Sequence, residues 1–277
     1  MGAAMTQTVS HAEFAGLLRQ VRRRQWRGAA IAAPAVALLG VAFAYAGAFD
    51  LARYADAAPT ILTLCRDSMP PDFARWREWG RPLLETLATG VGGTVLGAAL
   101  ALPLASLAAR NVGAPLWLGR AVLLALNAVR SIPGLIWGVI FVAAVGFGPL
   151  PGVLALGVHS TGMLGKLFSE AMEHIDPAPG DALRAHGVSK LGVLRFAIYP
   201  QVLPRLADAL LYRFEHNLRA ATTLGLVGAG GLGLEIVTAF HLFEYREASA
   251  LILVQLALVT AVNIAGAALR KGFLQGA

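Results

Sequence analysis

Six charged side chains interrupt long stretches of the sequence that are otherwise uncharged. They are Arg130, Lys166, Glu170, Arg213, Glu215 and Arg219. Arginine suits the recognition of oxyanions, because its planar guanidinium can donate two parallel hydrogen bonds to a phosphate-like group. A charge at the centre of a membrane helix costs about 2.5–3.5 kcal/mol on insertion scales, so each of these groups needs a partner or water. Two interpretations stay open: the charges pair and fix helix packing, or some of them contact an anion.

Spacing along a helix predicts which of these charges pair locally. Lys166 and Glu170 are four residues apart, and so are Glu215 and Arg219, which places each pair on one helix face. We expect Lys166 and Glu170 to form a structural pair, and Glu215 and Arg219 can pair locally. Under the second interpretation, Arg130, Arg213 or Arg219 lines a path for an oxyanion, with Glu215 beside it.

Composition favours the integral membrane class over any soluble class. Of 277 residues, 57% are hydrophobic and only 14% are charged, whereas an average soluble domain is nearer 25% charged. The net charge of +7 could suggest nucleic acid, but the basic residues lie at the ends of apolar runs and form no single patch. We therefore expect a lipid membrane as the surroundings and no nucleic acid.

The apolar runs predict an all-α protein with about six transmembrane helices. The expected spans are 28–49, 86–109, 121–146, 153–172, 202–226 and 248–269. Around them we expect a cytoplasmic segment at 1–27, an extracytoplasmic loop at 50–83, a transmembrane domain at 84–271 and a tail at 272–277. Basic residues in the short segments place both termini in the cytoplasm.

One long polar interval, residues 176–204, interrupts the downstream half of the sequence. Asp176 is expected to cap a short helix that stops at Gly187, a residue suited to a left-handed C-cap. Ser189 is expected to cap a second helix that ends at Tyr199-Pro200, because a residue before proline disfavours the helical region. This helix-turn-helix could enter a groove on a partner, or it could be an ordinary amphipathic surface loop.

The same interval resembles the EAA loop of ABC-transporter permeases, whose pattern is Glu-Ala-Ala, three residues, Gly, nine residues, then Ile-x-Leu-Pro. Ala182, Gly187 and Pro200 match the pattern outright and Asp181 is a conservative change. Leu183, Ala197 and Tyr199 depart from it. The stretches Arg130–Leu156, Gly162–Asp176 and Tyr212–Gly233 are similar to the phosphonate-type branch of these permeases. The likeness covers roughly residues 84–271.

The resemblance implies the permease subunit of an ATP-driven importer in a bacterial inner membrane. The cargo would be phosphonate or a related phosphorus oxyanion such as phosphite. The implied assembly has two permease chains, two ATPase subunits that hold ATP and Mg²⁺, and an extracytoplasmic solute-binding protein. It further implies that the EAA-like residues meet the ATPase, and that this chain holds no cofactor, metal or catalytic group.

A glycine cluster, with Gly228, Gly230 and Gly231, satisfies the G-x-G-x-x-G pattern literally. A dinucleotide site would need a preceding strand and a βαβ unit, which the charged helix before the cluster contradicts. We interpret it as a tight, close-packed turn near a gate. The sequence contains no G-x-x-x-x-G-K-[ST] cradle and no paired-cysteine metal site.

Three alternatives remain. A proton-coupled secondary transporter would use Glu170 or Glu215 as its proton site. An intramembrane hydrolase would use Ser160 with His159, although a lone membrane histidine more often serves packing or hydrogen bonding. The third is an ABC permease for another small solute.

Overall fold

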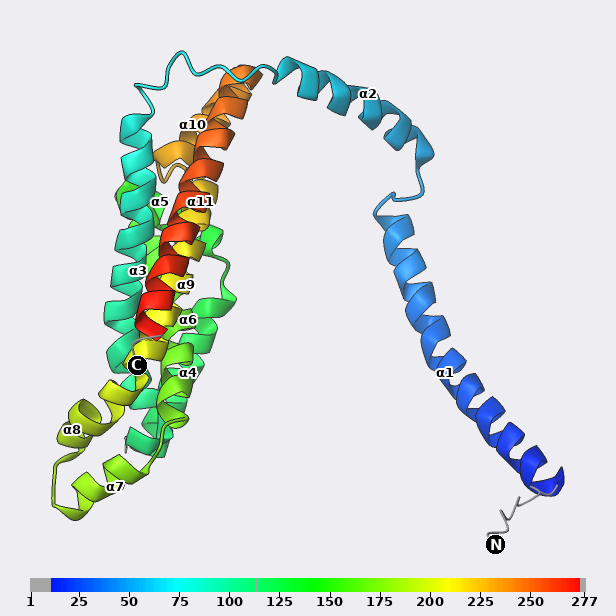
Figure 1. The fold of residues 1–277 in the computed structure, drawn as a ribbon. Helices are drawn as coiled ribbons and strands as arrows, with labels where there is room; N and C mark the ends of the chain where they lie inside the picture. The colour runs from blue at the N-terminus through cyan, green and yellow to red at the C-terminus, as the bar shows by residue number, and fades with distance from the viewer. Residues whose placement is uncertain (1–10, 113, 275–277) are drawn as a thin grey trace, which may run out of the picture. The chain divides into compact units, whose positions relative to one another are not determined.

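The computed structural model describes residues 11–112 and 114–274, and every regular element in that part of the chain is helical. The all-α prediction is therefore confirmed (Figure 1). The elements are α1 (His11–Tyr45), α2 (Leu51–Asp67), α3 (Gly80–Ala108), η1 (Arg110–Val112), α4 (Leu116–Ser131), α5 (Gly134–Val145), α6 (Pro149–Glu173), α7 (Ala178–Ala185), α8 (Lys190–Val193), η2 (Leu194–Ile198), α9 (Tyr199–Gly225), α10 (Gly231–His241) and α11 (Tyr245–Leu274).

The chain divides into two units, 1–65 and 66–277. The first unit contains most of α2 and all of α1, whose residues 22–45 are long and apolar enough to cross a membrane. The interval 50–83 thus contains a 17-residue helix that its mixed charge concealed. Part of the predicted cytoplasmic segment (1–10) and of the predicted tail (275–277) lies outside the described residues.

The second unit is built around α3, α6 and α9, which run alongside one another (Figure 1). Small residues allow α3 and α6 to approach closely. A Cβ added to Gly93 would lie 2.5 Å from the Leu156 Cβ, and one added to Gly97 would lie 2.5 Å from the Ser160 Cβ. Close packing by small residues is the usual way in which membrane helices associate. Any larger residue at these two positions would force the helices apart.

The number of spans follows from helix length and composition. Within the described residues, three helical stretches are long and apolar enough to cross a membrane, 22–45, 80–108 and 245–271, and the bent pair α4–α5 would make a fourth. Helices α6 and α9 have 25 and 27 residues, so they also reach membrane length, but charged residues interrupt them. These helices are consistent with the six predicted spans, and the number of spans stays a prediction.

The prediction of one continuous third span over 121–146 is wrong. The helix breaks into α4 and α5, which meet at 86°. Ile132 has extended backbone angles, because the ring of Pro133 disfavours the helical region for the residue before it. The indole N–H of Trp137 donates to the carbonyl of Val129 across this break, at 3.3 Å.

The prediction that the second loop helix ends at Tyr199-Pro200 is also wrong. The backbone continues from α8 through the π-turn η2 into α9 without interruption. In this wider turn the N–H of Tyr199 donates to the carbonyl of Leu194, five residues earlier. Pro200 then follows at the start of α9, where its ring has no N–H to donate back into the preceding turn.

Candidate translocation surface and coupling loop

Helix α9 carries a polar stripe on an exposed face. The stripe consists of Asp208, Tyr212, Arg219 and Thr223, all exposed. At 3.6 residues per turn these four positions fall within about 60° of arc. Arg219 forms no ion pair or hydrogen bond with any residue in the described part of the chain. A lone guanidinium facing lipid tails would be unfavourable, so this face suits water or another protein surface.

The predicted pair between Glu215 and Arg219 is wrong. The carboxylate of Glu215 instead accepts from Arg270 of α11, with the Nη2 to Oε1 distance at 2.7 Å. Arg270 also lies 3.1 Å from the Asp208 carboxylate. Gly266 makes room for this arrangement, since a Cβ there would lie 2.6 Å from the Glu215 Oε1. Arg270, which is more distant in the sequence, thereby pairs with both acids, and Arg219 stays unpaired among the described residues.

The opposite side of α9 contributes to a buried polar network that joins three helices. The Nε of Arg213 donates to the Ser160 hydroxyl at 2.8 Å. The side-chain amide of Asn217 donates to the hydroxyls of Thr94 and Ser160, both at 2.9 Å. Arg213 is 3% exposed, and its Nη2 is buried with no hydrogen-bond partner. Arg213 thus lies inside the bundle, not on the exposed stripe.

The remaining charged candidates lie apart from this network. Lys166 and Glu170 form the predicted ion pair, with their charged atoms 2.7 Å apart. Arg130 is exposed at the end of α4, where its backbone packs over Gly162 of α6. No described contact joins Arg130 to Arg213, so the sequence-predicted arginines form no single cluster.

Neither alternative based on single residues is supported by the geometry. Ser160 is fully buried, and its described partners are Arg213 and Asn217, not His159. The His159 ring instead lies at the break between α4 and α5, where a Cβ added to Gly134 would be 3.9 Å from its Cδ2. The two candidate proton sites are both held in ion pairs: Glu215, which is 14% exposed, with Arg270, and Glu170 with Lys166.

The glycine cluster forms a close-packed turn between α9 and α10. The N–H of Gly231 donates to the Glu85 carboxylate at 3.1 Å, and the N–H of Leu232 donates to the Thr86 hydroxyl at 2.9 Å. The N–H of Gly148 donates to the Gly228 carbonyl at 3.0 Å. Two α3 side chains therefore cap α10, as the close-packed interpretation requires, and a helix occupies the place where a dinucleotide site needs a strand.

Gly230 lies in the same turn as a close neighbour of Glu85. A Cβ added there would lie 3.0 Å from the Glu85 Oε2. Together with Gly228 and Gly231, it leaves no room for side chains at this end of the bundle. Whether the turn gates a path stays a prediction.

The EAA-like residues separate into a surface group and an anchoring group. Asp181, Ala182 and Gly187 are exposed on and after α7, and so is Pro200 at the start of α9. Gly187 has a φ of +75°, so the predicted left-handed turn is confirmed. The Ser189 hydroxyl accepts from the Gly192 N–H at 3.3 Å, which confirms the second cap.

The anchoring group holds this loop against α3 and α6. Ala197 is buried, and the Tyr199 hydroxyl lies 3.0 Å from the Ser106 hydroxyl of α3. Leu183 is half-buried and packs on the same apolar cluster, whose largest buried members are Phe168 and Met172. The interval is thus a folded part of the bundle with one free face.

Sequence reasoning missed the partners that complete these sites. Asn217, Thr94, Asp208 and Arg270 were not singled out. A signal existed for one of them: Asn217 lies four residues after Arg213, so both had to share a helix face.

A bundle of membrane-length helices with an unpaired cation on its surface and an anchored polar loop has the features of a membrane transport subunit. The chain belongs to the family of binding-protein-dependent transport system inner membrane components, whose model matches residues 101–275.

Relatives and solved structures agree with this family. The chain is 50% identical over 230 residues to the phosphite transport system permease protein PtxC of Stutzerimonas stutzeri, and the aligned region covers 83% of each of the two chains. It is 38% identical over 219 residues to the phosphate-import permease protein PhnE of Mycolicibacterium smegmatis, covering 78% of this chain and 41% of that protein. Its fold matches an inward-facing structure of the MetNI methionine ABC transporter with a TM-score of 0.62 and 25% identity, covering 69% of this chain and 93% of that chain.

Proposed function

We propose that this chain is the membrane-spanning subunit of an ATP-driven importer for phosphite or a phosphonate. The observation that carries the proposal is Arg219, an unpaired guanidinium on the exposed polar stripe of a membrane-length helix. A guanidinium recognises tetrahedral oxyanions bidentately. The names of the related permeases, which include phosphite and phosphate transport, support the same class of cargo.

In this proposal the stripe faces a second copy of the chain across the path. A face with Tyr212, Arg219 and Thr223 offers hydrogen bonds to a passing oxyanion without enclosing it. Weak and exposed contacts suit conduction, because a path must release what it binds. Selectivity then belongs to the solute-binding protein that delivers the cargo.

The energy would come from ATP and Mg²⁺ on a partner ATPase that meets the exposed face of α7. Asp181, Ala182 and Gly187 form that face, while Ala197 and Tyr199 hold the loop to the bundle. A push on α7 can reach η2 through the packing between these two elements, and η2 continues into α9 without a break. The ATPase lies in the cytoplasm, and so do both termini.

Reconstituted transport tests the proposal. The permease, its ATPase and its solute-binding protein are placed in liposomes, and uptake is measured for phosphite, methylphosphonate, hypophosphite and phosphate. We expect substrate-stimulated ATP hydrolysis and uptake of phosphite or the phosphonate. A proton-coupled carrier would instead take up its cargo without the ATPase and would stop when an uncoupler is added.

Variants then test the role of Arg219. Arg219→Gln removes a charge-assisted contact, for which we expect uptake to fall about tenfold or more while the subunits still co-purify. Arg219→Lys keeps the charge and should retain part of the uptake. Arg205→Gln is the matched control, because it removes the same charge from the other end of α9. Full uptake by Arg219→Gln would refute the proposed path.

A further inference from the structure

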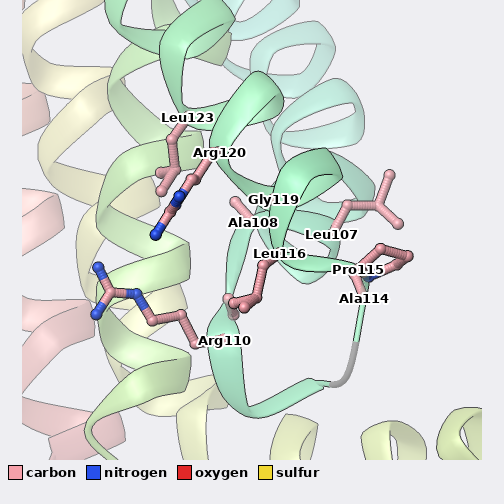
Figure 2. A pocket seen from close by; sticks show the side chains of 10 residues that line it. Leu107, Ala108, Arg110, Ala114, Pro115, Leu116, Gly119, Arg120 and Leu123 are labelled. Atoms are coloured by element: carbon pink, nitrogen blue, oxygen red, sulfur yellow. The ribbon is translucent and has the colours of Figure 1, made fainter.

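A small pocket lies between the end of α3 and the start of α4 (Figure 2). Its volume is about 170 Å³. The residues that line it are Leu107, Ala108, Ala109, Arg110, Ala114, Pro115, Leu116, Gly119, Arg120 and Leu123. Because it lies where the membrane-length helix α3 ends and the bent pair α4–α5 begins, we place this pocket at the level of the membrane surface.

Two arginines give the pocket a positive rim. Arg110 comes from η1 and Arg120 from the second turn of α4, and both guanidinium groups extend to the same side in Figure 2. Arg120 forms no hydrogen bond or ion pair with any residue that the structure describes. The Arg110 side chain is 80% exposed, and its Nε lies 3.9 Å from the Glu173 carboxylate.

Glu173 cannot neutralise both guanidinium groups. The Oε1 that faces Arg110 already accepts the backbone N–H of that residue at 3.0 Å. Glu173 contacts Arg110 and, among the described residues, nothing pairs with Arg120, so the rim keeps a net positive charge. The first turn of α4 adds to it, because Pro115 at the N-cap position provides no side-chain cap for the free N–H groups.

The floor and surroundings of the pocket are apolar. Leu107, Leu116 and Leu123 line it, and the adjacent Trp117 is 72% exposed. Exposed tryptophan next to such a turn is typical of the boundary between lipid and water. A free phosphate ion would use the arginines and leave the leucines in contact with water, whereas an amphiphile satisfies both.

We propose that this pocket binds the headgroup of an anionic phospholipid. The phosphate would lie between Arg110 and Arg120, and the glycerol and upper acyl chains would cover Leu107 and Leu116. Basic pockets between membrane helices commonly hold acidic headgroups. The bound lipid would fix the turn that joins α3 to α4, independently of which solute the protein transports.

Lipid binding to the purified full chain in detergent tests the inference. Retained lipid is measured by native mass spectrometry and the thermal midpoint is followed with phosphatidylglycerol, phosphatidylcholine or inorganic phosphate. We expect phosphatidylglycerol alone to bind and to raise the midpoint. Arg110→Gln and Arg120→Gln should each weaken its apparent affinity about tenfold, with the lipid-free midpoint nearly unchanged.

Arg195→Gln is the matched control, since Arg195 is exposed but lies outside the pocket. Equal weakening by this control would mean that net charge alone attracts the lipid, which overturns the inference. Equal protection by inorganic phosphate would overturn it too. So would a result in which the two pocket variants bind lipid normally but lose affinity for the ATPase, because the pocket would then receive a protein partner.

Discussion

The capped start of α10 depends on one glycine, and replacing it has a cost that can be worked out from the structure. Gly231 has a φ of +73°, and a Cβ there would lie 2.5 Å from the Thr86 Oγ1. Alanine in the left-handed region costs about 1–2 kcal/mol. Displacing the hydroxyl also leaves the buried N–H of Leu232 without its acceptor, which costs about 1–3 kcal/mol. We expect Gly231→Ala to lower the free energy of unfolding by about 2–5 kcal/mol.

Gly187→Ala is the matched control for this prediction. Gly187 has nearly the same φ, +75°, but no atom lies within 4 Å of its added Cβ. Gly187→Ala should therefore lower the free energy of unfolding only by the backbone cost of about 1–2 kcal/mol. Denaturant unfolding of the purified chain in detergent, followed by tryptophan fluorescence, compares the two variants with the natural sequence. Equal losses in the two variants would show that the Thr86 contact contributes nothing, and the reasoning would be refuted.

Two further predictions concern ion pairs. Arg270→Gln should lower the free energy of unfolding by about 1–3 kcal/mol, because the Glu215 carboxylate loses its partner. Adding Glu215→Gln should restore part of the lost stability. The thermal midpoints of the single and double variants measure both effects. The hydrogen bond from Arg75 lowers the pKa of the exposed Glu78 carboxyl. The pair therefore stabilises the fold fully above the ordinary glutamate pKa of about 4.3. This contribution disappears as the pH falls through the lowered pKa. Glu78→Gln should thus reduce the midpoint slightly at pH 7 and progressively less as the pH falls into the acid range, and a reduction that stays constant as the pH falls would contradict this assignment.

Local signals in the sequence predicted local structure well. The turn at Gly187 and the cap at Ser189 depend only on residues a few positions away, and both form as expected. The pair between Lys166 and Glu170 forms as well, for the same reason. Each of these features is decided within one or two helical turns.

Features decided by tertiary packing could not be predicted in this way. Glu215 had an arginine four residues away, yet it pairs with Arg270, 55 positions later, because Gly266 lets α11 approach α9. The two prolines show the same limit. Pro133 bends its span by 86°, whereas Pro200 is accommodated by a π-turn in a continuous helix, and the sequence around each proline does not distinguish the two outcomes.

Under the proposed function, α9 connects the loop, the network and the stripe in one rigid element. It runs without a break from η2 to Gly225, so Arg219 lies about 30 Å along the helix from Tyr199. The buried network at Arg213 and Asn217 fixes α9 to α3 and α6 about two-thirds of the way along this distance or beyond. A fixed point between two ends turns a push at the loop into an opposite displacement of the end of α9 that carries Arg219 and Thr223. The buried contacts of Arg213 then determine how the bundle moves, while Arg219 meets the cargo.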